Sequence, residues 1–227
     1  MIIAAVGLER ERRIVGGAGV EAIAGGGDHR QLETLLEARA AEAQGIISIG
    51  IAGGLAPRLC AGDWILADAV LSEGTPIPTD ALWTSRLAAR LPEAARGFLL
   101  GVDVIVAESA EKAELHRVTR ALALDMESHV AARVAQRHGL PFAVARVVCD
   151  PAHRTLPPAA LIAMKPDGGV NLPAILRSLL VRPSQLPALI RTGRDAERAF
   201  GSLFRGHGRL GAGLCGPDLG ELAVNLP

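Results

Sequence analysis

The chain has 227 residues, of which 49% are hydrophobic and 21% are charged, and its mean hydropathy is +0.29. This composition excludes a disordered chain and is sufficient for one large domain with a sizeable core. The 24 basic and 24 acidic residues cancel, and only 3% of the residues are aromatic. The chain therefore lacks both the charge and the stacking surface of a nucleic-acid-binding protein.

The cysteines and the first residues indicate a cytoplasmic protein. Cys60, Cys149 and Cys215 are scattered, without the spacing of a zinc site or a disulfide framework, which suits a reducing compartment. Residues 1–6 carry no basic leader, and no apolar run approaches the ~20 residues of a membrane span. We expect a cytoplasmic protein without a stable membrane span.

Short apolar runs alternate with stretches of helical periodicity over the first two thirds of the chain. Strands are predicted at residues 1–6, 20–24, 45–49, 64–71, 97–107, 121–125 and 142–149. Helices are predicted at residues 29–44, 79–91, 110–120 and 127–138, with Thr79 as the cap of the second. Strands separated by helices predict an α/β sheet that is covered on both faces.

The last third of the chain changes character. We expect a proline-containing loop at residues 150–158, followed by helices with apolar faces at residues 172–180 and 185–204. Residues 205–227 are rich in glycine and weakly patterned, which predicts a loose C-terminal tail. Residues 1–204 should form a single domain, because no linker divides them.

Ligands of open α/β sheets bind beyond the carboxyl ends of the strands, and polar or glycine-rich stretches follow four predicted strands. Glu11 lies just past the first strand, at a helix start. Its carboxylate could act as a base there, or it could be a solvated first-turn residue. The glycines of residues 50–54 could bring backbone N–H groups close to a ligand, or form an ordinary tight turn.

The other two stretches carry charged residues. Glu127 begins a helix directly after a strand, where it could accept hydrogen bonds from two sugar hydroxyls, or simply cap the helix. Arg146 lies inside an apolar strand and needs a carboxylate partner, for which Glu127 is the natural candidate. A period of two places Asp150 on the same face as Arg146. Asp150 could be a general acid, or the charges could form a purely structural ion pair.

Two further glycine motifs resemble sites that bind a dinucleotide or a phosphate, but neither match is strong. Residues 17–22 match a loose dinucleotide fingerprint, but they neither follow a strand nor open a helix, which argues against a dinucleotide-dependent oxidoreductase. Gly26, Gly27 and Arg30 precede a helix and could hold a phosphate, with a plain turn as the alternative. The histidines have no metal-binding spacing. We expect no metal and no cofactor, apart from inorganic phosphate as an alternative co-substrate.

Together, the four stretches resemble the purine nucleoside phosphorylase and methylthioadenosine/S-adenosylhomocysteine nucleosidase superfamily. The likeness runs from residue 1 to about residue 204. It rests on Glu11, on Gly50-Ile51-Ala52-Gly53-Gly54-Leu55-Ala56-Pro57 with Gly62-Asp63, on Ala123-Leu124-Asp125-Met126-Glu127 and on Arg146-Val147-Val148-Cys149-Asp150. Within the superfamily the chain looks most similar to the hopanoid-associated phosphorylase branch, because of the loops at residues 25–28 and 150–158 and the apolar C-terminal helices.

The resemblance implies a three-layer sandwich with a central, mostly parallel mixed sheet flanked by helices. It also implies an enzyme that cleaves the N-ribosidic bond of a purine nucleoside. Asp150 would protonate N7 of the base, Arg146 would support the site, and Glu11 would activate water. The substrate-binding residues would be Glu127 on the ribose hydroxyls, Met126 against the sugar, and Ile51, Gly53, Gly54 and Asp125 around them.

The sequence departs from the family pattern at two positions. Ile51 stands where many nucleosidases have Ser, and Cys149 replaces a Ser beside the acid. Burial beside an apolar strand should raise the pKa of Asp150, while Arg146 should lower it. We expect the loss of Asp150 to impair turnover far more than fold stability.

The resemblance favours release of adenine from a 5′-substituted adenosine, with adenosylhopane as the preferred substrate. A lipid tail could lie along the apolar faces of residues 172–180 and 185–204, or those faces could pack on the sheet or a twin subunit. The alternatives are a methylthioadenosine/S-adenosylhomocysteine-type nucleosidase and a non-catalytic nucleoside-binding protein. A carboxylate at residue 11 repels a phosphate dianion, which favours hydrolysis. Relatives are oligomers that often complete the site with a neighbouring subunit, so we expect a homodimer.

Overall fold

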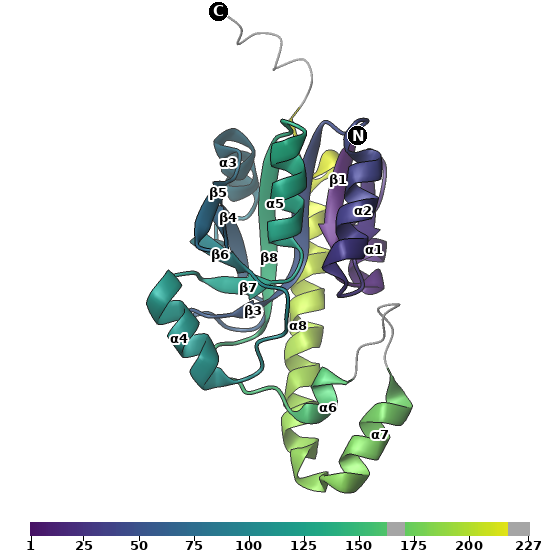
Figure 1. Ribbon diagram of the computed structural model, residues 1–227, viewed down its shortest axis with the longest axis vertical. Helices are drawn as coiled ribbons and strands as arrows, with labels where there is room; N and C mark the ends of the chain where they lie inside the picture. The colour runs from purple at the N-terminus through teal and green to yellow at the C-terminus, as the bar shows by residue number, and fades with distance from the viewer. Residues whose placement is uncertain (163–170, 218–227) are drawn as a thin grey trace, which may run out of the picture.

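The computed structural model describes residues 1–162 and 171–217. In this part of the chain one 8-stranded sheet is flanked by helices (Figure 1). The strands are Ile2–Val6 (β1), Val20–Ala24 (β2), Gly45–Gly54 (β3), Trp64–Ser72 (β4), Thr75–Pro78 (β5), Ala95–Gly101 (β6), Ala123–Asp125 (β7) and Phe142–Asp150 (β8). The α-helices are Glu9–Val15 (α1), His29–Ala40 (α2), Ala81–Arg90 (α3), Ser109–Thr119 (α4), Ser128–Arg137 (α5), Pro158–Leu161 (α6), Leu172–Val181 (α7) and Leu186–Leu210 (α8). Short 3-10 helices cover Pro183–Gln185 (η1) and Ala212–Cys215 (η2).

The sheet is mixed and mostly parallel. β2, β1, β3 and β8 lie side by side in that order, all parallel. β8 is antiparallel to β4, whereas β4, β6 and β7 follow one another in parallel. β7 then returns antiparallel to the end of β3, so that β3, β8, β4, β6 and β7 close into a ring. This sheet confirms the predicted α/β class.

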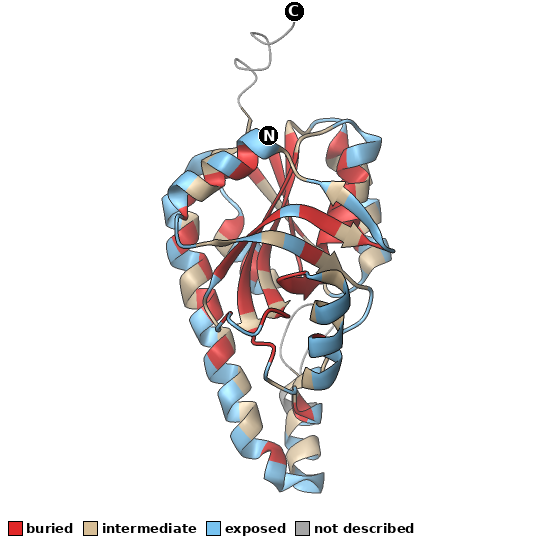
Figure 2. Ribbon diagram, turned by 90° about the vertical axis from the view of Figure 1, so that its left-hand side faces the viewer, coloured by how far each residue is buried: buried red, intermediate tan, exposed pale blue. Residues whose placement is uncertain are grey.

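Helices cover both faces of the sheet and create two buried layers (Figure 2). On one face, Leu36 of α2 and Val130 of α5 pack with Val144 of β8. On the other face, Trp83 of α3 and Leu203 of α8 belong to the second cluster, to which α1 also contributes. The expected three-layer arrangement follows from these two clusters, because each strand contributes alternate side chains to each layer.

Several predicted boundaries differ from the structure. The glycines of residues 50–54 do not form a turn but continue β3, because their backbone pairs with β8 and β7. The strand predicted at residues 97–107 is β6, which ends at Gly101. The cap of α3 is Asp80, whose Oδ1 accepts a hydrogen bond from Trp83 N at 2.7 Å. The Thr79 hydroxyl is engaged elsewhere and donates to Ala67 O at 2.8 Å.

The C-terminal region is more ordered than a loose tail from residue 205. α8 continues to Leu210, and both Leu210 and Leu214 are buried in the second core cluster. Trp83 Nε1 donates to Leu214 O at 2.9 Å, which ties this segment to α3. The predicted tail also covers residues 218–227, which lie outside the described residues.

Candidate active site

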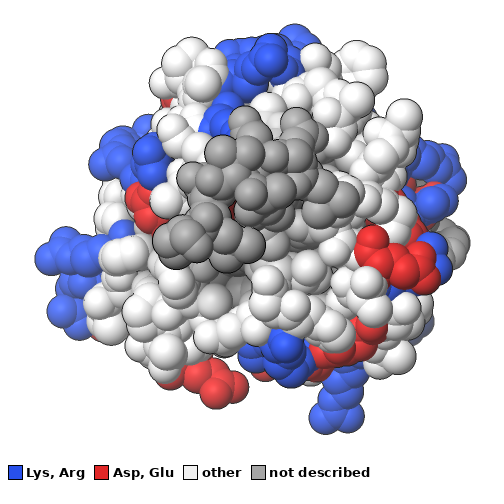
Figure 3. Space-filling model, turned by 90° about the horizontal axis from the view of Figure 1, so that it is seen from above, with Lys and Arg blue, Asp and Glu red and all other residues white. Residues whose placement is uncertain are grey.

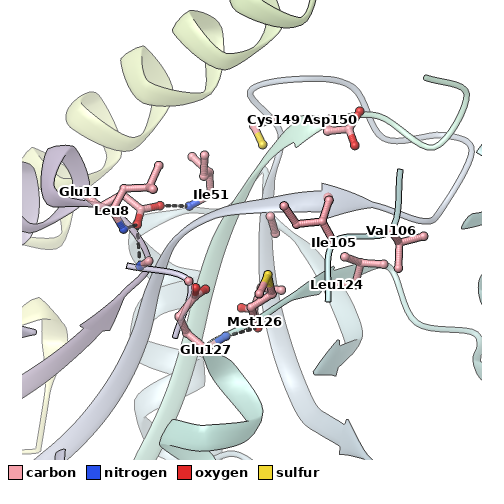
Figure 4. A pocket seen from close by; sticks show the side chains of 15 residues that line it. Leu8, Glu11, Ile51, Ile105, Val106, Leu124, Met126, Glu127, Cys149 and Asp150 are labelled. Atoms are coloured by element: carbon pink, nitrogen blue, oxygen red, sulfur yellow. Dashed lines mark hydrogen bonds between the residues drawn. The ribbon is translucent and has the colours of Figure 1, made fainter. Parts of the chain in front are cut away.

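A pocket of about 180 Å³ lies where strands β1, β3, β7 and β8 end (Figure 4). Glu127 and Asp150 both line it, so the two groups required by the sequence interpretation share one cavity. Figure 4 shows Glu11 and Glu127 toward one end of the pocket and Asp150 toward the other. The predicted site residues that line it are Glu11, Gly27, Ile51, Gly53, Asp125, Met126, Glu127 and Asp150.

Glu11 is held in place by three backbone N–H groups. It lies in the first turn of α1 and is 1% exposed, so it is not the solvated residue of the alternative reading. Its Oε2 accepts hydrogen bonds from Gly7 N and Leu8 N, each at 2.7 Å, and its Oε1 accepts one from Ile51 N at 2.6 Å. Burial raises the pKa of Glu11, while Arg146 and the three N–H groups lower it.

Gly50 makes room for this carboxylate. A Cβ at residue 50 would overlap Glu11 Oε1 and lie 2.8 Å from Arg146 Nη1, and the φ of +153° is one that L side chains rarely adopt. We expect Gly50→Ala to lower the free energy of unfolding by about 1–3 kcal/mol, because neither buried charge can move freely. Urea denaturation measures this change. Gly17→Ala, which meets no atom within 4 Å, is the control and should be nearly neutral.

Arg146 is fully buried behind the pocket and does not line it. Its Nε lies 2.6 Å from Asp125 Oδ2 in an ion pair whose angle is not that of a hydrogen bond. Its Nη2 donates to Ser48 Oγ at 2.6 Å and to Glu127 Oε2 at 3.2 Å. The predicted pairing with Glu127 is confirmed, and Asp125 is a second and closer carboxylate. Arg146 therefore orients and partly neutralises acidic groups at this end of the pocket.

Asp125 has more local partners than a free ligand-binding carboxylate. Its Oδ1 accepts hydrogen bonds from Ser128 N at 2.9 Å and Glu127 N at 3.3 Å, and its Oδ2 accepts one from Ser128 Oγ at 2.5 Å. These contacts cap the start of α5. Together with the ion pair to Arg146, they fix the position of Glu127. Asp125 lines the pocket, but its contacts are those of a positioning residue.

Glu127 carries a strongly shifted pKa. Burial raises the pKa of Glu127 to about 8; Arg146 opposes the shift, and the carboxylates of Asp125 and Glu11 reinforce it. The folded protein thus holds this proton more tightly than the unfolded chain. The stabilising contribution is complete below pH 4.5, the ordinary value, and is lost as the pH rises to about 8.

We therefore expect the stability of the wild type to decline relative to Glu127→Gln as the pH rises between 4.5 and 8. The free energies of unfolding from urea titrations at several pH values measure the difference. Glu93→Gln is the control, because Arg209 lowers the pKa of this exposed glutamate. The difference in stability between Glu93→Gln and the wild type should stay nearly constant from pH 4.5 to 8, because a lowered pKa changes stability only below 4.5. A pH-independent difference for Glu127→Gln would contradict the shift.

Asp150 lies at the other end of the pocket, and its partner is Lys112 of α4. Lys112 is fully buried, and its Nζ donates to Asp150 Oδ2 and, at 2.9 Å, to Arg154 O. Burial raises the pKa of Asp150, and Lys112 lowers it. The predicted effect of burial is confirmed. The opposing cation, however, is Lys112 and not Arg146.

A β-bulge explains why Asp150 and Arg146 have different neighbours. Ala52 pairs with Val148 and Gly53 pairs with Asp150, which leaves Cys149 as an extra residue in β8. The bulge breaks the period of two, so Asp150 faces the pocket while Arg146 stays in the interior. Bulges are frequent beside active sites, where they redirect a side chain.

The role of Lys112 as the partner of Asp150 was not predicted from the sequence, although the rarity of lysine in this chain could have indicated it. Only two of the 24 basic residues are lysines, at positions 112 and 165. Lysine is thus rare in a chain that otherwise uses arginine. An ammonium is also more compact than a guanidinium and fits a closed cavity beside one carboxyl group. The α4 periodicity alone gave no reason to direct this residue inward.

The predicted phosphate-binding residues are not gathered in the pocket. Gly27 lines it, but Gly26 and Arg30 do not, and Arg30 is exposed. The first free N–H groups of α2 are already used, since Asp28 Oδ1 accepts hydrogen bonds from Arg30 N at 2.9 Å and Gln31 N at 3.0 Å. Such a carboxylate occupies the place of an anion at a helix start. A phosphate site here stays a prediction without support from this geometry.

The rest of the pocket wall is largely apolar. Ile51 and Cys149, the two departures from the family pattern, both line it, together with Leu8, Ala52, Ile105, Val106 and Leu124. Burial raises the pKa of Cys149 to about 12, so its sulfur is a neutral thiol at neutral pH. Gly54 does not line the pocket and faces Val148 and Pro151 in the interior. No described residue of α7 or α8 contributes, so the suggested lipid channel along those helices is not part of this pocket.

The chain was compared with models of protein families and with solved structures. The model of the phosphorylase superfamily matches residues 20–180. A 5′-methylthioadenosine/S-adenosylhomocysteine nucleosidase of Helicobacter pylori is similar in structure, with 16% identity, a TM-score of 0.66 and coverage of 92% of this chain and 95% of that chain.

Two other solved structures are similar to the chain. The futalosine hydrolase of Helicobacter pylori strain 26695 has 16% identity and a TM-score of 0.66, with 92% of this chain and 96% of that chain covered. An S-adenosylhomocysteine nucleosidase of Streptococcus pyogenes has 18% identity and a TM-score of 0.58, with 90% and 96% covered. At these identities the likeness shows a shared fold.

Proposed function

Since the chain belongs to the phosphorylase superfamily and is an enzyme that cleaves N-glycosidic bonds, we propose that it hydrolyses a 5′-substituted adenosine and releases adenine. The observation that carries the proposal is the pocket with Asp150 at one end and Glu127 and Glu11 at the other (Figure 4). Departure of a purine requires a proton on the base and negative charge near the sugar, and the two ends provide these separately.

Asp150 serves the base end of the reaction. The C1′–N9 bond breaks, its electron pair moves into the purine, and Asp150 gives a proton to N7. Burial raises the pKa of Asp150, which makes the protonated form that this step needs more accessible, whereas Lys112 favours the ionised form. Lys112 Nζ donates a hydrogen bond to Oδ2 of the same carboxyl group and holds it at this end of the pocket.

Glu127 and Glu11 serve the sugar end. Glu127 accepts hydrogen bonds from the ribose hydroxyls. Its ionised form, which Arg146 favours and burial opposes, stabilises the oxocarbenium ion that forms as the base leaves. Glu11 orients a water molecule toward C1′ and takes its proton. Its three backbone N–H donors fix the carboxylate, which lowers the cost of orientation at the moment of reaction.

Water fits this pocket better than phosphate as the nucleophile. Three carboxylates, those of Glu11, Asp125 and Glu127, lie at the sugar end. Among the described residues, the buried cations nearest to the pocket already have carboxylate partners: Arg146 pairs with Asp125 and Glu127, and Lys112 pairs with Asp150. A phosphate dianion would meet repulsion without a free cation to offset it.

The 5′ substituent is proposed to be apolar, because the pocket wall is. Adenosylhopane is our first candidate, on the resemblance to the hopanoid-associated branch and on this apolar lining. Methylthioadenosine or S-adenosylhomocysteine is the second, and the structurally similar nucleosidases favour it. A homodimer stays a prediction. Ile105, which lines the pocket and is 42% exposed, and its chain neighbour Val104, which is 69% exposed, would suit the dimer interface.

Product analysis tests the proposal. We expect adenine and a free ribose end on the former 5′ substituent after incubation with adenosylhopane, at the same rate with and without phosphate. Chromatography of adenine, with mass spectrometry of the sugar product, measures this. Arg30→Ala should leave the rate unchanged, because Arg30 is outside the pocket.

The other results separate the alternatives. A ribose 1-phosphate product and a rate that depends on phosphate would overturn hydrolysis. Faster release from methylthioadenosine would assign the second substrate class. Binding of adenosine derivatives without any adenine release would show a non-catalytic nucleoside-binding protein.

A further inference from the structure

A helical arm projects beyond the sheet, at the end opposite the N-terminus (Figure 1). We define the arm as α6, α7, η1 and α8 up to Arg194. Buried Gln185 holds it together: its Oε1 accepts a hydrogen bond from Ala159 N at 3.0 Å, and its Nε2 donates to Ser178 O and Ser178 Oγ, each at 2.8 Å. Gln185 therefore ties the starts of α6 and α8 to the end of α7.

The outer surface of the arm is unusually apolar. Leu180 is 85% exposed, Val181 is 73% exposed and Leu176 is 61% exposed. Leu176 and Leu180 are four residues apart and share one face of α7. Leu186 and Ile190 add two half-exposed aliphatic side chains on α8. Single exposed leucines are ordinary, but three strongly exposed aliphatic residues between positions 176 and 181 of one helix indicate a binding surface.

The charge of the arm has one sign. Arg177, Arg182, Arg191 and Arg194 are all exposed, and no Asp or Glu occurs from residue 171 to residue 194. Within the two described stretches, no carboxylate pairs with any of these four guanidinium groups. Figure 3, which views the opposite end of the molecule, shows basic and acidic side chains together. The unmixed positive charge is thus a property of the arm in a chain whose net charge is zero.

We propose that the arm docks on the surface of an anionic phospholipid bilayer. Leu176, Leu180 and Val181 would enter the headgroup region, and the arginines would bind lipid phosphates. Exposed aliphatic residues beside arginines that no described carboxylate neutralises are the features of helices that lie in a membrane interface. No helix among residues 1–162 and 171–217 is long and apolar enough to cross a bilayer, so the contact is peripheral.

Charge complementarity favours a bilayer over a second copy of the chain. Arg177 and Arg182 lie together beside Val181. A two-fold interface brings the same surface of two subunits together, which would set these two arginines against their own copies. An anionic lipid surface neutralises them instead. The docking inference does not rest on the proposed substrate. It places the pocket end of the sheet near the membrane, because residues 151–157 lead directly from Asp150 to α6.

Co-sedimentation of the full chain with phospholipid vesicles tests the docking. We expect strong binding to vesicles that contain phosphatidylglycerol, weak binding to pure phosphatidylcholine, and loss of binding at high salt. Arg177→Glu with Arg182→Glu should weaken binding more than about tenfold, since one arginine near such a surface changes partitioning about fivefold. The double variant Leu180→Asp with Val181→Asp should abolish binding to the vesicles.

Leu82→Asp and Arg90→Glu on α3 are the matched controls, because both residues are exposed and lie outside the arm. Both should bind vesicles like the wild type. Equal binding to neutral and anionic vesicles, or none to either, would overturn the proposal even if an arm variant fails to fold. An oligomer in solution that Leu180→Asp with Val181→Asp dissociates would also overturn it, in favour of a contact between copies.

Discussion

Replacement of Asp150 by Asn is expected to lower kcat/KM for adenine release by about 10²–10⁴-fold, the usual contribution of a positioned general acid. The variant keeps the size of the side chain but has no acidic proton for N7. Steady-state kinetics with a 5′-substituted adenosine measure the loss. Turnover within a few-fold of the wild type would show that another group protonates the base.

The same variant should also lose stability, which differs from the expectation based on the sequence. Asp150→Asn leaves the fully buried ammonium of Lys112 without an anionic partner. Breaking a buried pair in this way costs about 3–5 kcal/mol. Lys112→Met combined with Asp150→Asn is the matched control, because it removes both charges. It should regain much of the stability and none of the activity, which separates the two roles of the pair.

Replacement of Arg146 by Met should also destabilise the fold strongly. Methionine fills much of the buried space but leaves Asp125 and Glu127 without their cation. We expect the free energy of unfolding to fall by about 3–5 kcal/mol, because buried carboxylates then lack compensation. Activity should fall as well, since Glu127 loses its orientation. Urea denaturation at neutral pH measures the stability.

A surface ion pair provides the control for this result. Arg96 pairs with Asp68 at 2.6 Å, and the two side chains are 50% and 43% exposed. Arg96→Met should cost no more than about 1 kcal/mol, because solvent screens the pair. Arg146→Met with Asp125→Asn should recover part of the loss by removing one uncompensated charge. Equal costs for the two single variants would contradict the structural role of Arg146.

Much of the fold could be predicted because its signals are local. β1, β2 and β8 lie within a residue of their predicted bounds, since buried parallel strands are short, continuous apolar runs. The glycines at residues 50–54 also give a local signal, because glycine readily adopts the backbone conformations of a turn, and this signal predicts a turn there. Here the glycines allow close approach instead: Gly50 leaves space for Glu11, and Gly53 lies opposite Leu124 of β7.

The amino-acid sequence by itself determined the α/β class and which side chains follow strand ends, because strand ends on one edge of a sheet come together whatever the details of packing. This brought Glu11, Glu127 and Asp150 into one pocket. Only the tertiary structure decided which charges meet. Lys112 lies 38 residues from Asp150 along the chain, and the periodicity of helices and strands does not predict contacts between residues so far apart in sequence. The bulge at Cys149 and the helix packing of α4 set the pair, and with it the proton on which the proposed reaction depends.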